Sequence, residues 1–178
     1  CDNYWQLRRS TMSNVSEKYI SLYQEMASLC EQNGWGDPFS YARSKEIYAA
    51  CVLGHSMPGP SDYSGADAIN ASGHGVEYKS TIGAKIKGSY TGISVQPDWD
   101  SQVKYLREEK ILKYPEHYYN RFEDGKLVES WVLTGQQVYD ILLPKLKKKF
   151  ATVLSKKDPR LSADVTNSDI MKFGTRVL

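Results

Sequence analysis

The sequence has few cysteines, and their spacing suits neither a disulfide framework nor a zinc site. Its 178 residues include only Cys1, Cys30 and Cys51, with no C-x-x-C pair among them. An odd number of cysteines without that spacing argues against a disulfide-stabilised secreted domain. The three histidines have no shared spacing, which disfavours zinc as well. We therefore expect a protein of a reducing compartment.

Long apolar runs and an excess of charge of one sign are also missing. No stretch approaches the roughly 20 apolar residues of a membrane span, and the opening "CDNYWQLRRS" lacks the apolar run of a secretory signal. Lysine and arginine total 23 against 21 aspartate and glutamate, so the formal charge is +2. A charge this small does not by itself mark a nucleic-acid-binding protein. The composition predicts a soluble, cytoplasmic protein with no membrane partner.

Apolar periodicity predicts helices at the beginning of the chain and again after its middle. Apolar side chains at four- and three-residue steps predict an amphipathic helix over 14–30, and a second helix is expected over 39–53. Pro97 is positioned to open a third helix. A longer helix is expected over 134–154, interrupted or kinked at Pro144.

Two β-hairpins are expected between these helices. The stretch "GADAINASGHGVEYKSTIG", residues 65–83, has two short apolar runs around a glycine-rich turn, and Asp124-Gly125 separates two β-rich runs. The polar stretch 155–169 is expected to form a loop, and 170–178 a last strand. The order of elements predicts an α+β fold in one domain over 1–178, with a mixed β-sheet flanked by helices.

The first hairpin carries the residues that point to chemistry. Glu77 and Lys79 share one face of a strand, and Asp67 lies ten positions before Glu77, where the turn can fold it back toward them. Two nearby carboxylates repel unless a cation lies between them, and Mg2+ prefers such oxygen ligands. A lysine beside them can stabilise charge that develops on a phosphate. The alternative is structural: a solvated Glu-Lys pair and an aspartate that forms a turn.

The pattern D-x9-E-x-K resembles the motif of the PD-(D/E)XK nucleases, and the flanking residues resemble their type II restriction endonucleases in particular. The shared features are "MPG" before the hairpin, Asp67-Ala68, Asn70, Glu77, Lys79-Ser80, Gly88, Pro97 and the ending "FGTRVL". The resemblance implies a PD-(D/E)XK fold and Mg2+-dependent cleavage of double-stranded DNA at a short palindromic site. It further implies a bacterial cytoplasmic protein with a cognate methyltransferase as its genetic partner.

The resemblance also implies a role for each residue of the motif. Asp67 and Glu77 would be metal ligands, the Tyr78 carbonyl would complete the metal shell, and Lys79 would be the catalytic lysine. The helices over 14–53 would form a homodimer, 65–133 would be the catalytic sheet region, and 134–178 would supply a DNA-binding helix and C-terminal segment. A two-fold dimer suits a palindromic site.

The residues expected to contact DNA follow the hairpin and recur near the end of the chain. An enzyme of the family that the chain resembles reads bases through a histidine cluster, whereas this chain has the expected loop "SYTGISVQ" there, which predicts a different target sequence. Its hydroxyl and amide groups are candidates to contact base edges, and nearby basic side chains are candidates to contact phosphates. The candidates are Lys85, Lys87, Ser89, Tyr90, Thr91, Ser94, Gln96, Lys156, Lys157 and Arg160.

Two other functions remain open from the sequence. A non-catalytic DNA-binding dimer would explain the basic residues while leaving the hairpin carboxylates structural. A repair or junction-resolving nuclease of the same fold would keep the chemistry but recognise DNA structure in place of base sequence. The first alternative predicts no Mg2+-dependent cleavage, and the second predicts cleavage governed by DNA shape.

Overall fold

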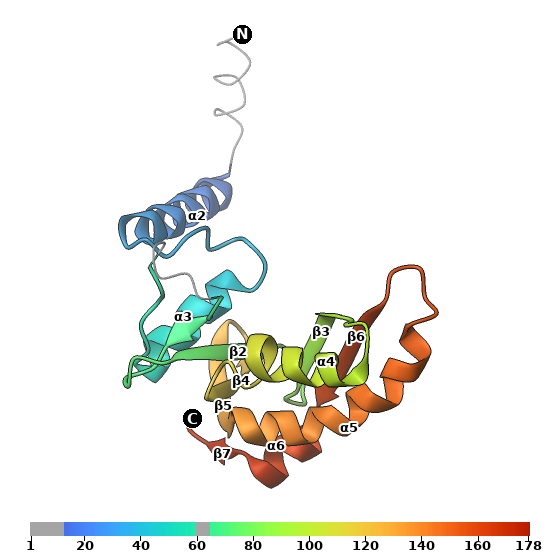
Figure 1. Cartoon of the computed structure of the whole chain (residues 1–178). Helices are drawn as coiled ribbons and strands as arrows, with labels where there is room; N and C mark the ends of the chain where they lie inside the picture. The colour runs from blue at the N-terminus through green and yellow to red at the C-terminus, as the bar shows by residue number, and fades with distance from the viewer. Residues whose placement is uncertain (1–12, 60–64) are drawn as a thin grey trace. The chain divides into compact units, whose positions relative to one another are not determined.

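A computed structural model describes residues 13–59 and 65–178 of the chain, drawn in colour in Figure 1. The chain divides into two compact units, Cys1–Ser44 and Lys45–Leu178, which are described separately. No helix within the described ranges is long and apolar enough to cross a membrane. The predicted single domain over 1–178 stays a prediction.

The first unit is built around helix α2 (Asn14–Gln32). The hydroxyl of Ser13 caps it by accepting a hydrogen bond from the Ser16 N–H at 3.2 Å, and Gly34 at φ 66° follows its end. This confirms the helix predicted over 14–30. One side of α2 exposes a row of large apolar residues, namely Val15 (78% exposed), Tyr19, Leu22, Met26 and Leu29.

Helix α3 (Arg43–Leu53) is shorter than the predicted 39–53. Its first predicted turn is replaced by tight turns, in which Tyr41 adopts a positive φ of 47°. The alanines of α3, Ala49 and Ala50, pack against Val76 and Tyr78 of the sheet. Small side chains allow the helix to lie close to the strands there.

The second unit contains a mixed five-stranded sheet in the order β1-β2-β4-β5-β7. The strands are β1 (Ala68–Ile69), β2 (Gly75–Thr81), β4 (Glu116–Glu123), β5 (Lys126–Thr134) and β7 (Thr175–Arg176). β2 and β4 run parallel, and the other neighbours are antiparallel. The predicted α+β fold, a mixed sheet flanked by helices, is confirmed.

Both hairpins form where turn residues predicted them. Asp124 at φ 49° and Gly125 at φ 74° join β4 to β5 in left-handed conformations, as an Asp-Gly turn requires. In the β1–β2 turn, the side chain of Asn70 accepts hydrogen bonds from the backbone N–H groups of Ser72 and His74. The amide of Asn70 also donates to Glu116 of β4 at 2.9 Å, which ties this turn to the centre of the sheet.

Helices α4 (Trp99–Tyr105), η2 (Leu106–Lys110), α5 (Gly135–Val153) and α6 (Asn167–Phe173) complete the second unit. Figure 1 shows α5 and α6 along the same side of the sheet. α5 runs through Pro144 as one continuous helix, so the predicted interruption is absent, although the helix bounds are close to those expected. η2 is a π-helical turn that directly continues α4, which begins two residues after Pro97.

Two segments differ from the sequence-based expectation. The supposed base-reading loop is a strand, β3 (Gly88–Ser94), and the supposed polar loop over 155–169 contains a strand, β6 (Arg160–Val165). They pair antiparallel as a separate two-stranded sheet, the β3–β6 ribbon. The last strand predicted over 170–178 is reduced to β7, because α6 occupies the first part of that stretch, up to Phe173.

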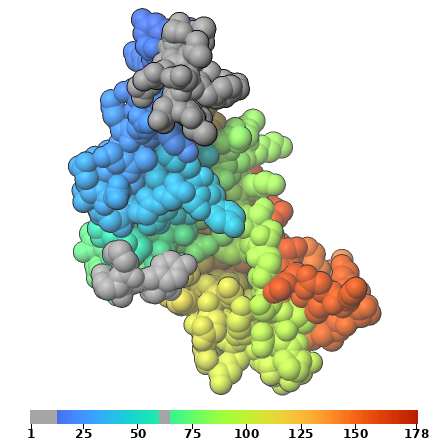
Figure 2. Space-filling model, turned by 90° about the horizontal axis from the view of Figure 1, so that it is seen from above, coloured from blue at the N-terminus to red at the C-terminus, as the bar shows by residue number. Residues whose placement is uncertain are grey.

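The ribbon and α5 lie over the main core. Trp99 of α4 meets Phe150 of α5 edge to face, with ring centroids 5.3 Å apart. In the surface view of Figure 2, the yellow-green surface of the α4 region borders the orange surface that follows α5. The central sheet therefore has α3 against one face and the ribbon with α5 against the other.

Candidate active site

The β1–β2 hairpin brings the three predicted catalytic residues together. The backbone N–H of Asp67 donates to the Val76 carbonyl at 3.0 Å, so Asp67 stands at the entrance of β1 directly opposite β2. Its carboxylate accepts a hydrogen bond from the Tyr78 N–H at 2.8 Å. The ten-residue separation in sequence is thus closed by the turn, as the hairpin prediction required.

Glu77 and Lys79 lie on one face of β2, while Val76 and Tyr78 are buried on the other. The Lys79 Nζ donates to the Glu77 Oε1 at 2.7 Å, and both side chains are about one fifth exposed. An ion pair at this depth is screened less by water than a surface pair, so its geometry is well defined.

The Asp67 carboxyl is held in an environment that disfavours its charge. Burial, the neighbouring carboxylate of Glu77 and the more distant Glu46 of α3 raise the pKa of Asp67 to about 7. The Tyr78 N–H and the Lys79 ammonium oppose this rise without cancelling it. An aspartate that only forms a turn does not require burial beside a second carboxylate. The raised pKa of Asp67 therefore marks a candidate functional site.

The donor set of the hairpin suits a hard divalent cation. Within the described ranges, no group of three or more histidine, cysteine, aspartate and glutamate side chains is arranged to hold a metal ion. Asp67 and Glu77 are a pair of carboxylates, and Mg2+ is commonly held by one or two protein carboxylates together with substrate phosphates and water. The mutual repulsion of the two carboxylates is what such a cation would relieve, so these residues fit Mg2+.

A polar hollow of about 360 Å3 opens beside Glu77 and Lys79. η2 and the segment after it supply two more cations to its lining, Lys110 and Lys113, and η2 also supplies the carboxylate of Glu109. Both lysines are exposed, and neither takes part in an ion pair within the described ranges. Sequence reasoning missed them, because nothing local shows that a segment more than thirty residues after β2 returns to the same hollow.

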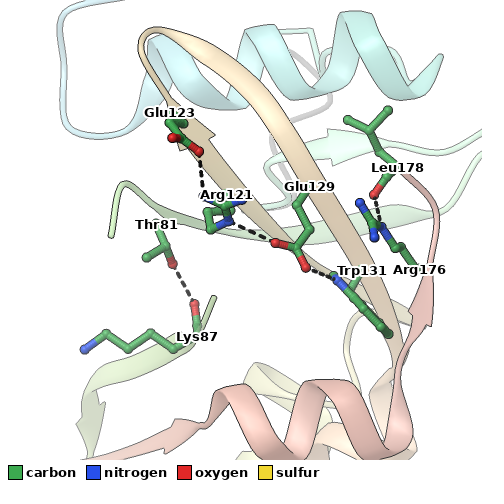
Figure 3. Close-up of polar contacts among 8 residues, drawn as sticks. All are labelled: Thr81, Lys87, Arg121, Glu123, Glu129, Trp131, Arg176 and Leu178. Atoms are coloured by element: carbon green, nitrogen blue, oxygen red, sulfur yellow. Dashed lines mark hydrogen bonds and ion pairs between the residues drawn. The ribbon is translucent and has the colours of Figure 1, made fainter. Parts of the chain in front are cut away.

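The charges at the far end of β4 and β5 are, by contrast, mutually satisfied. Figure 3 shows Arg121 between Glu129 and Glu123, at 2.9 and 3.1 Å, and the Trp131 ring N–H donating to Glu129 at 2.7 Å. These side chains neutralise one another on the strand surface. Lys110 and Lys113 differ from these side chains, because neither has an ion-pair partner among the described residues.

Tyr90 is buried in the core, and its side chain lines the hollow beside Lys79. Its side chain is 8% exposed, and its hydroxyl lies 2.9 Å from the His117 Nδ1 and 2.8 Å from the Tyr119 hydroxyl. Direct base contact by Tyr90 does not fit this burial. The alternation of β3 turns its side chain inward, a direction that a loop interpretation could not supply.

The remaining predicted DNA contacts lie at the surface of the ribbon and of the turns beside it. Thr91 is exposed, while Ser89, Ser94 and Gln96 are half-buried. The Arg160 guanidinium donates to the Ser94 Oγ across the ribbon at 3.3 Å. Lys156 and Lys157 are exposed in the turn before β6.

Lys85 and Lys87 are exposed but do not continue β2. They belong to the turn between β2 and β3, which is closed by a hydrogen bond from the Thr81 hydroxyl to the Lys87 carbonyl at 3.0 Å. Figure 3 shows the Lys87 side chain extending away from the Arg121 and Glu129 pair. Continuing the alternation of the strand would have placed Lys85 and Lys87 on the face of Glu77 and Lys79. That expectation is wrong, because β2 ends at Thr81.

The histidines bind within the protein and form no shared site. His55 Nδ1 lies 2.6 Å from the Tyr78 hydroxyl, and His117 is fully buried. Burial lowers the pKa of His117 and so favours the neutral ring, although the hydrogen bond to the Ile111 carbonyl acts in the opposite direction.

No protein-family model matches the chain, and the search of curated proteins found no match for its sequence.

Proposed function

We propose that this protein is a Mg2+-dependent endonuclease that cuts double-stranded DNA at a short palindromic site, as type II restriction enzymes do. The observation that carries the proposal is the meeting of Asp67, Glu77 and Lys79 on one hairpin, with the pKa of Asp67 raised to about 7 and a cation-lined hollow beside them. The sequence resemblance to PD-(D/E)XK restriction endonucleases supplies the reaction class.

Asp67 and Glu77 are the side chains that would hold Mg2+, with the Tyr78 carbonyl as a third oxygen. When bound, the ion supplies Lewis acidity to the scissile phosphate and to the attacking water. The hydrogen bond from the Tyr78 N–H fixes one oxygen of Asp67, which orients the other oxygen.

Lys79 supplies a positive charge at the position where the phosphate gains negative charge in the transition state. Its ion pair with Glu77 fixes the ammonium on the same face as the carboxylates. A donor that is already oriented stabilises developing charge without reorganising during the reaction. Removing it should affect the chemical step more than DNA affinity.

The hollow beside Lys79 is suited to the DNA backbone. Lys110 and Lys113 line it and have no carboxylate partner within the described ranges, so they remain available to phosphate oxygens. Such contacts position the duplex and carry no sequence information. Lys85, Lys87, Lys156, Lys157 and Arg160 are further candidates for the same work.

Base recognition is assigned to the exposed edge of the β3–β6 ribbon and the residues that follow it. A two-stranded ribbon fits the width of the major groove. Ser89, Thr91, Ser94 and Gln96 carry the hydroxyl and amide groups that can donate or accept at base edges. Tyr90 is withdrawn from this set because of its burial.

A homodimer is the assembly we propose for the active enzyme. The row of exposed apolar residues on α2 includes Tyr19, Leu22 and Met26, and a second copy would remove it from water. Two copies related by a two-fold axis would present two active sites to the two strands of a palindrome. The bacterial cytoplasm and a cognate methyltransferase belong to this proposal.

Digestion of a fully sequenced plasmid in Mg2+, followed by sequencing of the fragment ends, tests the function. Discrete fragments with one shared end sequence are expected, and they would also give the recognition site and the stagger of the cut. A repair or junction nuclease would instead cut branched duplexes and leave the linear plasmid intact. Binding without cleavage in Mg2+ and Mn2+ would favour the non-catalytic dimer and contradict the proposal.

A further inference from the structure

Lys79 is held from two sides, by a carboxylate and by an aromatic ring. Its Nζ lies 2.7 Å from Glu77 and 4.7 Å from the centroid of the Tyr90 ring. A cation at this distance over a ring face is attracted by the electrons of the ring. Glu77 is itself a candidate ligand for Mg2+, so its oxygens are shared between two positive charges. The ring does not compete for those oxygens, and it can hold the ammonium while they face a cation.

The Tyr90 ring is fixed by a buried chain of hydrogen bonds. His117 Nε2 lies 2.9 Å from the Ile111 carbonyl, which can only accept, so the ring proton of His117 is on Nε2. The His117 Nδ1 must then accept from the Tyr90 hydroxyl at 2.9 Å, and the Tyr119 hydroxyl donates to Tyr90 at 2.8 Å. This order gives every group in the chain a partner and leaves no rotational choice for Tyr90.

Gly88 makes room for this arrangement. A Cβ at Gly88 would overlap the Tyr119 ring and would approach the Lys79 Cγ to 3.0 Å. Gly88 has no positive φ, so glycine is required here because there is no space for a side chain. The close approach of β3 to β2 is what brings the ring of Tyr90 under the Lys79 ammonium.

We propose that Tyr90 is a positioning residue whose ring face, fixed through His117 and Tyr119, holds the Lys79 ammonium in place for phosphodiester cleavage. The proposal rests on the proposed nuclease function for its kinetic consequences, but not for the placement of Lys79. The Tyr90 ring lines the same hollow as Lys79. Its action is exerted through Lys79.

The kinetic test compares two substitutions that separate the ring from the hydroxyl. Tyr90→Leu removes the ring, and the single-turnover cleavage rate in Mg2+ should fall about tenfold or more with little change of DNA affinity in Ca2+. Tyr90→Phe keeps the ring but leaves the His117 Nδ1 unpaired, so it should lower the melting temperature while keeping the rate within about threefold of wild type. Equal rate losses in the two variants, or a normal rate in Tyr90→Leu, would overturn the proposal.

A double-mutant cycle excludes a merely structural role. In the Lys79→Ala background, Tyr90→Leu should cause no further loss of rate, because the residue that it positions is already absent. A further loss as large as that in the wild-type background would contradict the proposal.

Placement can be measured without any cleavage assay. In the nuclear magnetic resonance spectrum of the wild-type protein, the Lys79 Hε protons should be shifted upfield by the Tyr90 ring, while those of the exposed Lys85 should not. The shift should persist in Tyr90→Phe and vanish in Tyr90→Leu. An unshifted Lys79 in the wild type refutes the positioning role even if DNA is cut, and a shifted Lys79 in a protein that cuts no DNA rejects the nuclease function alone.

Discussion

Residues of the β1–β2 hairpin and of the β3–β6 ribbon were both predicted to act on DNA, yet the two regions differ in the charge and burial of their polar side chains. The hairpin concentrates charge at partial burial, so that the Asp67 carboxyl ionises only near neutral pH. The ribbon carries hydroxyl groups and the exposed charged side chains Arg160 and Asp164, and its buried Tyr90 hydroxyl is hydrogen-bonded inside the core. Among these groups, only the Asp67 carboxyl of the hairpin is buried at an electrostatic cost. This difference leads us to propose that the hairpin carries the chemistry and that the ribbon contacts the double helix.

Removing the positive charge of Lys79 should lower the cleavage rate more than any change to the ribbon or to the hollow. Lys79→Ala is expected to lower the single-turnover rate by about 100- to 1,000-fold, with DNA affinity in Ca2+ changed far less, because the lost charge acts mainly in the transition state. The matched control is Lys87→Ala, which removes an exposed lysine of the neighbouring turn. Similar losses in both variants would show that Lys79 has no special role.

The hairpin should also impose a pH dependence on stability that the ribbon does not. In metal-free protein the folded-state pKa of Asp67, about 7, lies above the unfolded value of about 3.9, so the folded state holds the proton more tightly. The free energy of unfolding must therefore fall as pH rises from about 4 through 7.

Denaturant unfolding at pH 5 and pH 8 checks this slope. Wild type should lose on the order of 2 kcal/mol more than Asp67→Asn between these pH values, since the shift spans about three pKa units and only part of it lies in that interval. Asparagine keeps an oxygen for the Tyr78 N–H, which makes it a close control. Identical pH dependence in the two proteins would show that the Asp67 pKa is not raised.

The hollow beside the hairpin should contribute affinity without specificity. Substituting both Lys110 and Lys113 by alanine is expected to weaken binding to cognate and scrambled duplexes alike, by roughly tenfold, and to reduce the salt slope of affinity by about 1 for each lysine. Lys126→Ala, at the exposed start of β5, is the control that should leave both quantities unchanged. A loss confined to the cognate duplex would make these lysines base-reading residues.

The smallest expected effect concerns the ribbon. Ser94→Ala and Gln96→Ala should each cost about 1 kcal/mol of discrimination between cognate and scrambled duplexes, at the low end of the range for base contacts. Lys85→Ala should weaken binding to both duplexes equally. If Ser94 and Gln96 variants also lose equally on both duplexes, the ribbon does not read bases.

The two hairpins were predictable because their determinants are local. Asp124-Gly125 specifies a turn by its own backbone preferences, and strict alternation along 75–81 places Glu77 and Lys79 on one face. The apolar spacing over 14–30 and the bounds near 134–154 likewise reflect short-range patterns. The interruption predicted as one possibility at Pro144 does not occur, because a proline within a helix can be accommodated by its packing in the fold.

The ribbon was not predictable, because each of its strands depends on a partner far away in sequence. In β6, Leu161, Ala163 and Val165 alternate with polar residues, and the surrounding lysines and serines conceal that period. Pairing with β3, some seventy residues earlier, supplies the hydrogen bonds that make 160–165 a strand. The inward direction of Tyr90 follows from the same pairing.

The central claim is that Asp67 and Glu77 act as a metal-binding pair for DNA cleavage. The most direct measurement is the single-turnover cleavage of the cognate duplex in Mg2+ by wild type and by Asp67→Asn, with DNA affinity measured in Ca2+ for both. We predict that wild type cuts and that Asp67→Asn loses at least about 1,000-fold in rate while remaining folded and able to bind DNA. Cleavage by Asp67→Asn at close to the wild-type rate, with the same dependence on Mg2+, would contradict the claim.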